Sequence, residues 1–131
     1  MVAIEAIKES NGKYLAYTDN GREYTGIEVF DWASKVAKLG AGEIVITSVD
    51  NEGTGRGYDI ELVSGVAKSV SIPVIAHGGA GKIDHVIDVF KKSRANSAMV
   101  SSLFHYHFIR NNKSNPSIPV SYTHLRAQRP Y

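Results

Sequence analysis

Short runs of β-branched and apolar residues alternate along this chain with longer segments in which apolar residues recur at helical spacing. The runs cover residues 2–6, 43–48, 73–76 and 97–101, and the helical segments cover about 26–39, 59–70 and 83–92. Gly40 should end the first helix and Asp59 should cap the second. This alternation is typical of parallel strands joined by crossover helices. The sequence therefore predicts an α/β fold with a parallel sheet and one hairpin excursion, at 13–18.

The number of these units is half of what a closed barrel needs. Four strand–helix units occupy residues 1–112, whereas a complete (β/α)8 TIM barrel usually takes about 250 residues. We therefore expect half of a (β/α)8 barrel, with a small open parallel sheet as the alternative. Half a barrel would leave the strands at 2–6 and 97–101 as bare edges, which predicts that the isolated chain self-associates.

The last residues, 113–131, keep neither the strand period nor the helix period. They begin with the breaker-rich stretch SNPSIP and end in SYTHLRAQRPY, which resembles a translated adapter sequence. We expect 113–131 to be a disordered, non-native tail and leave it out of the fold prediction.

The composition excludes several classes of function. The chain has 15 basic and 13 acidic residues and a net charge of +2 without long runs of one sign. Neither a nucleic acid nor an anionic membrane is therefore an expected partner. The chain contains no cysteine, which removes disulfides and thiolate chemistry. No apolar run approaches the roughly 18 residues of a membrane span, and the expected location is the cytoplasm.

The five histidines do not predict a metal centre. His105 and His107 lie two residues apart, which puts them on different faces of a helix, and no carboxylate cluster completes a ligand set. We therefore expect neither a metal nor a cofactor.

Chemically useful residues follow each predicted strand. Ligands of parallel α/β structures bind at the carboxyl ends of the strands. There the sequence places Glu5, then Asp50 with three nearby glycines, then HGGAGK at 77–82, and then SSLFH at 101–105. These residues should meet at one edge of the sheet.

The last two strand ends predict a phosphate site. Glycines between a strand and a helix let backbone N–H groups approach an anion. The candidates are His77, Gly78, Gly79, Ser101 and Ser102. HGGAGK is not a Walker loop, because its glycine spacing differs and it does not end in Lys followed by Ser or Thr. His77 would add a positive charge to the site when its imidazole is protonated. The alternative is that both loops are tight turns closed by glycine.

Two carboxylates are candidates for general acid–base catalysis. Asp50 ends a strand beside flexible glycines, and Glu5 occupies the corresponding end of another strand. Asp50 could instead serve an Asx-turn or a helix cap. Glu5 could instead point outward and pair with Lys8.

Four segments resemble, in this order and spacing, the second half of the cyclase subunit of imidazole glycerol phosphate synthase. They are VAIEA, REYTGIEVFDWASKVAKLGAGEIVITSVDNEGTGRGYD, IPVIAHGGAGKIDH and SSLFH, within about 2–112. The resemblance implies the C-terminal half of a (β/α)8 barrel. It also implies a lyase of histidine biosynthesis with a glutaminase subunit as its partner. That enzyme converts a ribulosyl-aminoimidazole carboxamide nucleotide, phosphorylated at both ends, and glutaminase-derived ammonia into imidazole glycerol phosphate and an aminoimidazole carboxamide ribotide.

The resemblance also implies roles for single residues. It makes Asp50 a contributor to the active site, and the glycines that follow would keep the mouth of the barrel open for the ligand. The residues beside the substrate and one of its phosphates would be Gly53, Thr54, Gly78, Gly79, Ser101 and Ser102.

The chain departs from the resembling family in three places. A first catalytic aspartate would lie upstream of Met1, Glu5 stands where the family has its second aspartate, and His77 stands where it usually has serine. One extra methylene can displace a general acid by about an angstrom, which can cost about a hundredfold in rate. We expect this chain alone to be inactive, because half of the catalytic pair and the other phosphate site would be absent from it. Two alternatives stay open: a cyclase-like paralogue that assists ammonia delivery for amidino-sugar synthesis in surface polysaccharides, and a non-catalytic phosphate-binding half barrel.

Overall fold

The computed structural model describes residues 1–18, 23–100 and 123–126. In these ranges the chain forms three helices and a seven-stranded sheet in the order β3-β2-β1-β4-β5-β6-β7. The elements are β1 (Val2–Lys8), β2 (Tyr14–Thr18), β3 (Glu23–Glu28), α1 (Val29–Lys38), β4 (Ile44–Ser48), α2 (Ile60–Ser69), β5 (Val74–His77), α3 (Ile83–Lys92), β6 (Ser97–Val100) and β7 (Thr123–Arg126). None of the three described helices is long and apolar enough to cross a membrane.

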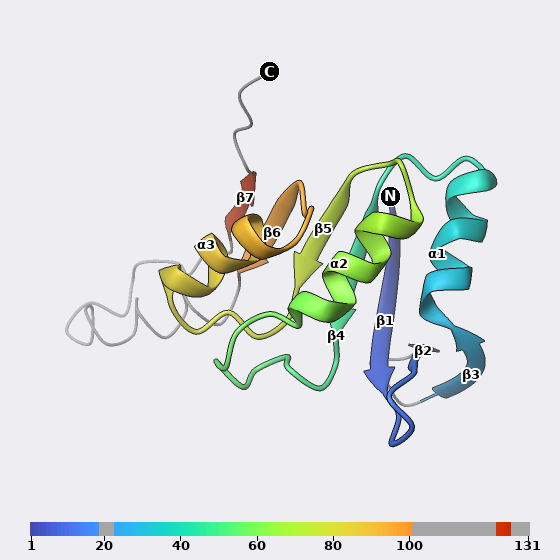
Figure 1. Ribbon diagram of the computed structural model, residues 1–131, viewed down its shortest axis with the longest axis horizontal. Helices are drawn as coiled ribbons and strands as arrows, with labels where there is room; N and C mark the ends of the chain where they lie inside the picture. Colours follow the sequence, from blue (N-terminus) through green and yellow to red (C-terminus); the bar gives the residue numbers. More distant parts are fainter. Residues whose placement is uncertain (19–22, 101–122, 127–131) are drawn as a thin grey trace, which may run out of the picture.

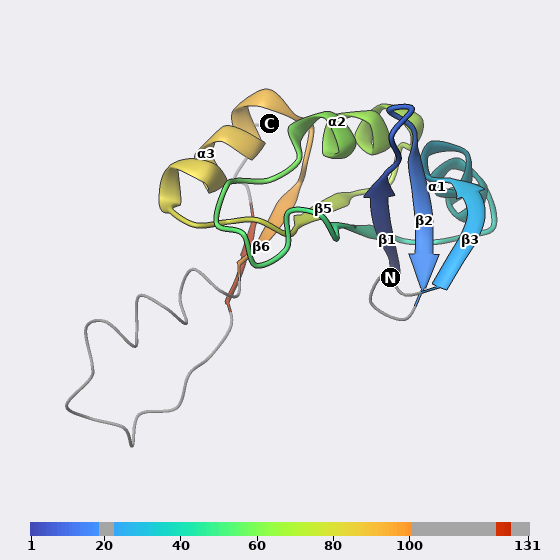
Figure 2. The same ribbon diagram turned by 90° about the horizontal axis from the view of Figure 1, so that it is seen from below.

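The four central strands of the sheet run parallel. β1 pairs with β4, β4 with β5 and β5 with β6. The helices cover one face of this parallel sheet, as the two views in Figures 1 and 2 show. The predicted α/β class and the strand–helix order of a half barrel are confirmed. The helix expected after β6 falls outside the described residues.

Alternate residues of the parallel strands point to opposite faces of the sheet. Ile46 on β4 and Ala76 on β5 face the helices and are completely buried in the core. The next residue of each strand, Thr47 or His77, points to the helix-free face. Glu5 of β1 is in register with Thr47, so the three side chains form one row. This row ends at the candidate site.

The ends of the helices follow the capping signals in the sequence. Asp59 caps α2, and its carboxylate accepts a hydrogen bond from the N–H of Leu62 at 3.0 Å. After α1, Gly40 has a φ of +105° and donates its N–H to the carbonyl of Ala37 at 3.2 Å, which ends the helix. Both caps were predicted, and α3 spans the predicted range.

The first helix begins later than predicted. Residues 23–28 extend as β3 beside β2, and α1 begins at Val29. The carboxylate of Glu28 accepts hydrogen bonds from the N–H groups of Phe30 and Asp31 at 3.0 and 2.9 Å. Glutamate is not among the usual capping residues, so the sequence did not indicate this start. The predicted hairpin excursion therefore contributes two strands, β2 and β3, beyond β1.

The two strands expected to be bare edges are both paired. β1 is covered by β2, and β6 is covered by β7, each in antiparallel orientation. β7 lies inside 113–131, and the rest of 113–131 lies outside the described residues, so the expectation of a disordered, non-native tail stays a prediction. The unpaired backbone groups of an edge such as β6 can accept any extended segment. Self-association through these two edges loses its physical basis, and association of the chain stays a prediction.

A buried tyrosine connects the hairpin to α2. Tyr14 of β2 is 4% exposed, and its hydroxyl donates to the Asp59 carboxylate, with distances of 3.0 and 2.9 Å to the two oxygens. Its ring meets Phe30 of α1 edge-on, with 5.9 Å between the centroids. Burial, assisted by the Asp59 carboxylate, raises the pKa of Tyr14, so the phenol keeps its proton. Asp59 therefore stabilises α2 and the hairpin at the same time.

Replacing Asp59 by alanine should remove both the cap of α2 and the acceptor of Tyr14. Each loss typically costs about 1–2 kcal/mol, so we expect the free energy of unfolding in urea to fall by about 2–3 kcal/mol. Asp88→Ala is the matched control, because Asp88 forms an exposed pair with Lys92 at 3.8 Å on one helix, worth at most about 0.5 kcal/mol. Equal losses in both variants would contradict the role given to Asp59.

Candidate functional site

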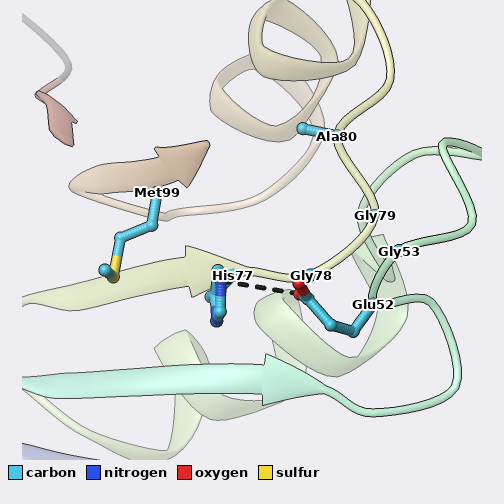
Figure 3. Close-up of a pocket in the computed structure, with 7 residues that line it drawn as sticks. All are labelled: Glu52, Gly53, His77, Gly78, Gly79, Ala80 and Met99. Atoms are coloured by element: carbon cyan, nitrogen blue, oxygen red, sulfur yellow. Dashed lines mark ion pairs between the residues drawn. The ribbon is translucent and has the colours of Figure 1, made fainter. Parts of the chain in front are cut away.

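A pocket lies at the carboxyl ends of β4 and β5 and reaches β6. Figure 3 shows its lining residues, which are Glu52, Gly53, His77, Gly78, Gly79, Ala80 and Met99. The space is about 200 Å³ including its open mouth.

His77 ends β5 and is held at both ring nitrogens. Its Nδ1 lies 3.0 Å from Oγ1 of Thr47 on the neighbouring strand. Its Nε2 lies 3.5 Å from Oε2 of Glu52, the ion pair drawn as a dashed line in Figure 3. The imidazole therefore has a fixed orientation at the base of the pocket.

A turn after β4 brings Glu52 to this position. The N–H of Glu52 donates to the carbonyl of Ser48 at 3.0 Å, and the N–H of Asn51 donates to the Ser48 hydroxyl at 3.3 Å. This turn directs the Glu52 side chain back over the end of the sheet, towards His77. The sequence analysis missed Glu52, although it directly precedes Gly53 and was therefore recognisable as a second acidic residue at the end of the same strand.

The glycine loops after β4 and β5 pack backbone against backbone. The N–H of Gly57 donates to the carbonyl of Gly79 at 2.7 Å, and Asn51 Nδ2 donates to the carbonyl of Gly57 at 3.0 Å. A Cβ on Gly79 would overlap the Gly57 carbonyl, and a Cβ on Gly81 would overlap the carbonyl of Gly55. The close approach of the two loops therefore depends on Gly79 and Gly81, because a Cβ on Gly55 or Gly57 would meet no atom closer than 3.7 or 3.4 Å. The expectation that the glycines after Asp50 keep the mouth open for a ligand stays a prediction.

Gly78 and Gly79 adopt a backbone conformation that favours glycine. Their φ angles are +99° and +109°. A Cβ on Gly78 would lie 2.7 Å from the carbonyl oxygen of Ser48 and 3.3 Å from Oε2 of Glu52. The Glu52 carboxylate thus lies directly against the loop for which an anion was predicted.

The other predicted residues divide between the pocket and its surroundings. Gly53 lines the pocket, whereas the Thr54 hydroxyl donates to the carbonyl of Asn51 at 2.7 Å and stabilises the loop itself. Ser101 and Ser102 lie outside the described residues. Met99 of β6, which the sequence analysis did not consider, completes the lining.

The two predicted catalytic carboxylates do not line the pocket. Asp50 is exposed, and its Oδ2 accepts a hydrogen bond from the backbone N–H of Lys8 at 2.9 Å, which joins the end of β4 to β1. Glu5 is partly buried in the row with Thr47 on the helix-free face. The Lys8 amine pairs with Glu61 at 3.5 Å. The catalytic roles of Glu5 and Asp50 stay predictions.

A buried tyrosine fixes β6 beside the pocket. Tyr58 is 6% exposed, and its hydroxyl donates to the carbonyl of Met99 at 2.8 Å. Burial and, to a lesser degree, the charge of Glu52 raise the pKa of Tyr58, so it remains a neutral donor. In the part of the chain that the structure describes, no group of three His, Asp or Glu side chains could hold a metal ion.

Comparison with known proteins gives the relationships of the chain. The profile of a family described as "Histidine biosynthesis protein" matches residues 1–110. Imidazole glycerol phosphate synthase subunit HisF of Bacillus cereus is 49% identical over 106 residues, and the subunit of the same name from Lactococcus lactis subsp. cremoris is 49% identical over 107 residues. Each alignment covers 81% of this chain but only 42% or 41% of the relative. The chain therefore spans about two fifths of the length of these relatives.

Replacing Gly79 by alanine should destabilise the fold more than the same change at Gly53. Both residues have positive φ angles, +109° and +77°, and that strain costs roughly 1–2 kcal/mol in each variant. Only at Gly79 does the new Cβ meet backbone, while nothing lies within 4 Å at Gly53. We expect the free energy of unfolding of Gly79→Ala to be lower than that of Gly53→Ala by about 2 kcal/mol or more in urea titrations. Equal values would mean that the loops separate without cost.

Proposed function

The chain belongs to the histidine biosynthesis protein family, and from this premise we propose that its pocket binds a phosphate group of a small-molecule substrate. The observation that carries the proposal is the meeting of His77, Glu52 and the glycine loop at the carboxyl ends of β4 and β5. Ligands of parallel α/β folds bind at this end of the sheet, and glycine-rich loops expose N–H groups to anions.

The whole protein of which this chain is a half is, in this proposal, the cyclase subunit of imidazole glycerol phosphate synthase. It would convert the ribulosyl-aminoimidazole carboxamide nucleotide and ammonia into imidazole glycerol phosphate and the aminoimidazole carboxamide ribotide. The names of the relatives support this activity, and the word "subunit" in those names supports a partner. We propose that the partner is a glutaminase subunit that delivers the ammonia, and that the enzyme acts in the cytoplasm.

The proposal gives each predicted residue a role. Glu5 would serve as general acid or base from the row that it shares with Thr47. Asp50 would have to release the Lys8 N–H before its carboxylate could act on a ligand. The residues proposed to contact the substrate and its phosphate are Gly53, Thr54, His77, Gly78, Gly79, Ser101 and Ser102.

A second candidate function rests on Glu5 and His77, where the family resemblance leads us to expect aspartate and serine. These differences favour a cyclase-like paralogue that assists ammonia delivery for amidino-sugar synthesis, or a phosphate-binding half barrel without catalysis. The paralogue would keep both the pocket and the glutaminase partner. The non-catalytic half barrel would keep only the pocket.

Isothermal calorimetry with a bis-phosphorylated ribulose tests the binding proposal. We expect the chain to bind this ligand with a dissociation constant below about 1 mM, which corresponds to about 4 kcal/mol, and to catalyse no cyclisation. Unphosphorylated ribulose is the control and should give no measurable heat. Equal binding of both sugars would contradict a phosphate site, and turnover by this chain alone would contradict its expected inactivity.

Growth of a histidine auxotroph separates the two candidate functions. A full-length version that contains this half should restore growth without histidine if the whole protein is the cyclase. Failure of that version, together with rescue by Glu5→Asp, would show altered chemistry and favour the paralogue. Failure of both versions, while binding persists in calorimetry, would favour the non-catalytic form.

A further inference from the structure

The pocket contains one pair of ionisable side chains among its described lining residues. They are Glu52 and His77, and the other lining residues are glycine, alanine and methionine. The two side chains are 39% and 24% exposed, so water reaches both. With the imidazole neutral, the lining carries one negative charge, and with the imidazole protonated the two charges cancel.

The negative charge lies where the proposed phosphate would bind. Oε2 of Glu52 is 3.5 Å from Nε2 of His77 and 3.3 Å from the position that a Cβ on Gly78 would occupy. Figure 3 shows the carboxylate between the imidazole and the Gly78–Gly79 loop. An oxyanion near these glycines would therefore meet a like charge at close range, which disfavours its binding unless a cation is added.

The imidazole can supply that cation without moving. When it is neutral, Nε2–H can donate to Glu52 while Nδ1 accepts from the Thr47 hydroxyl. When it is protonated, both nitrogens donate, because the hydroxyl oxygen of Thr47 can also accept. Histidine side chains ordinarily change charge between pH 5 and 8. The contacts of His77 are therefore compatible with both charge states.

We propose that Glu52 and His77 are the specificity-determining pair of this site, so that an oxyanion binds together with a proton that His77 takes up. This inference rests on the proposed function, because it assumes that the pocket receives a phosphate. Linkage then requires the affinity to rise as the pH falls through the titration of the imidazole. Since one proton is taken up, the slope is at most about tenfold per pH unit.

Among the described residues, the groups other than Glu52 that contact His77 or line the pocket beside it are uncharged. Thr47 on β4 and Met99 on β6 are neutral, and Tyr58, which donates to the Met99 carbonyl, keeps its proton because burial raises its pKa. On β1, Glu5 lies one strand beyond Thr47 in the same row. Glu5 is not among the residues that line the pocket.

Sulfate is the suitable probe, because it keeps both charges from about pH 5.5 to 8.5 and any pH dependence then belongs to the protein. We expect the chain to bind sulfate about tenfold more tightly at pH 5.5 than at pH 8.5 in NMR titrations of the loop amides. His77→Ser should bind with little dependence on pH. Glu52→Gln should bind more tightly than the unchanged chain at pH 8.5, because the repelling charge is gone. His85→Asn is the control, because His85 accepts the Gly81 N–H outside the pocket, and it should keep the full dependence.

The results of these titrations distinguish the proposed role of the Glu52–His77 pair from the proposed binding of phosphate in the pocket. Three results would overturn the assignment of the pair while leaving phosphate binding in place. The first is a sulfate affinity that does not change with pH. The others are a pH dependence of the affinity that survives in His77→Ser or disappears in His85→Asn. If Glu52→Gln binds sulfate at pH 8.5 no more tightly than the unchanged chain does, the proposed role of Glu52 is overturned. Absence of sulfate and inorganic phosphate binding in every folded variant, at every pH, would overturn the proposed function itself.

Discussion

The candidate site depends on one backbone contact, between Gly57 and Gly79. This hydrogen bond joins the loops that follow β4 and β5, and both loops come so close that a side chain on Gly79 would overlap the facing carbonyl. A single backbone hydrogen bond contributes only about 1 kcal/mol to stability. The steric requirement is therefore the stronger constraint, since any larger residue at Gly79 would push the loops apart and open the floor of the pocket.

The parallel sheet and this contact together determine the chemistry of the pocket. The register of β4 and β5 puts Thr47 beside His77, and the turn from Ser48 to Glu52 returns a carboxylate to the same point. Neither Thr47 nor Glu52 is close to His77 in sequence. Three side chains, from β4, β5 and the turn after β4, therefore meet at the end of the sheet.

The sequence predicted the regular part of the fold well, because its signals are local. The Asp59 cap, the Gly40 helix end and the bounds of α3 each depend on a few neighbouring residues. The site was predicted only in part. The position of His77 at the carboxyl end of a strand, before two glycines, led to its prediction as a site residue, and it lines the pocket. The side chains after β4 leave the strand period, so periodicity could not show that Glu52 and not Asp50 lines the pocket. β7 was also beyond prediction, because its pairing depends on the free edge of β6 rather than on its own sequence.

All described residues that line the pocket fall between Glu52 and Met99, within one continuous stretch of chain. Within the described residues, none of those that line the pocket comes from β1, β2 or β3. Together with Thr47, which holds His77, and the proposed phosphate contacts Ser101 and Ser102, the proposed site spans residues 47–102. A recombination event with both crossovers outside 47–102 would therefore transfer the proposed site to another gene in one piece. Evolution can then vary the remainder of such a protein, including Glu5 on β1, the proposed general acid, while the proposed anion site is inherited unchanged.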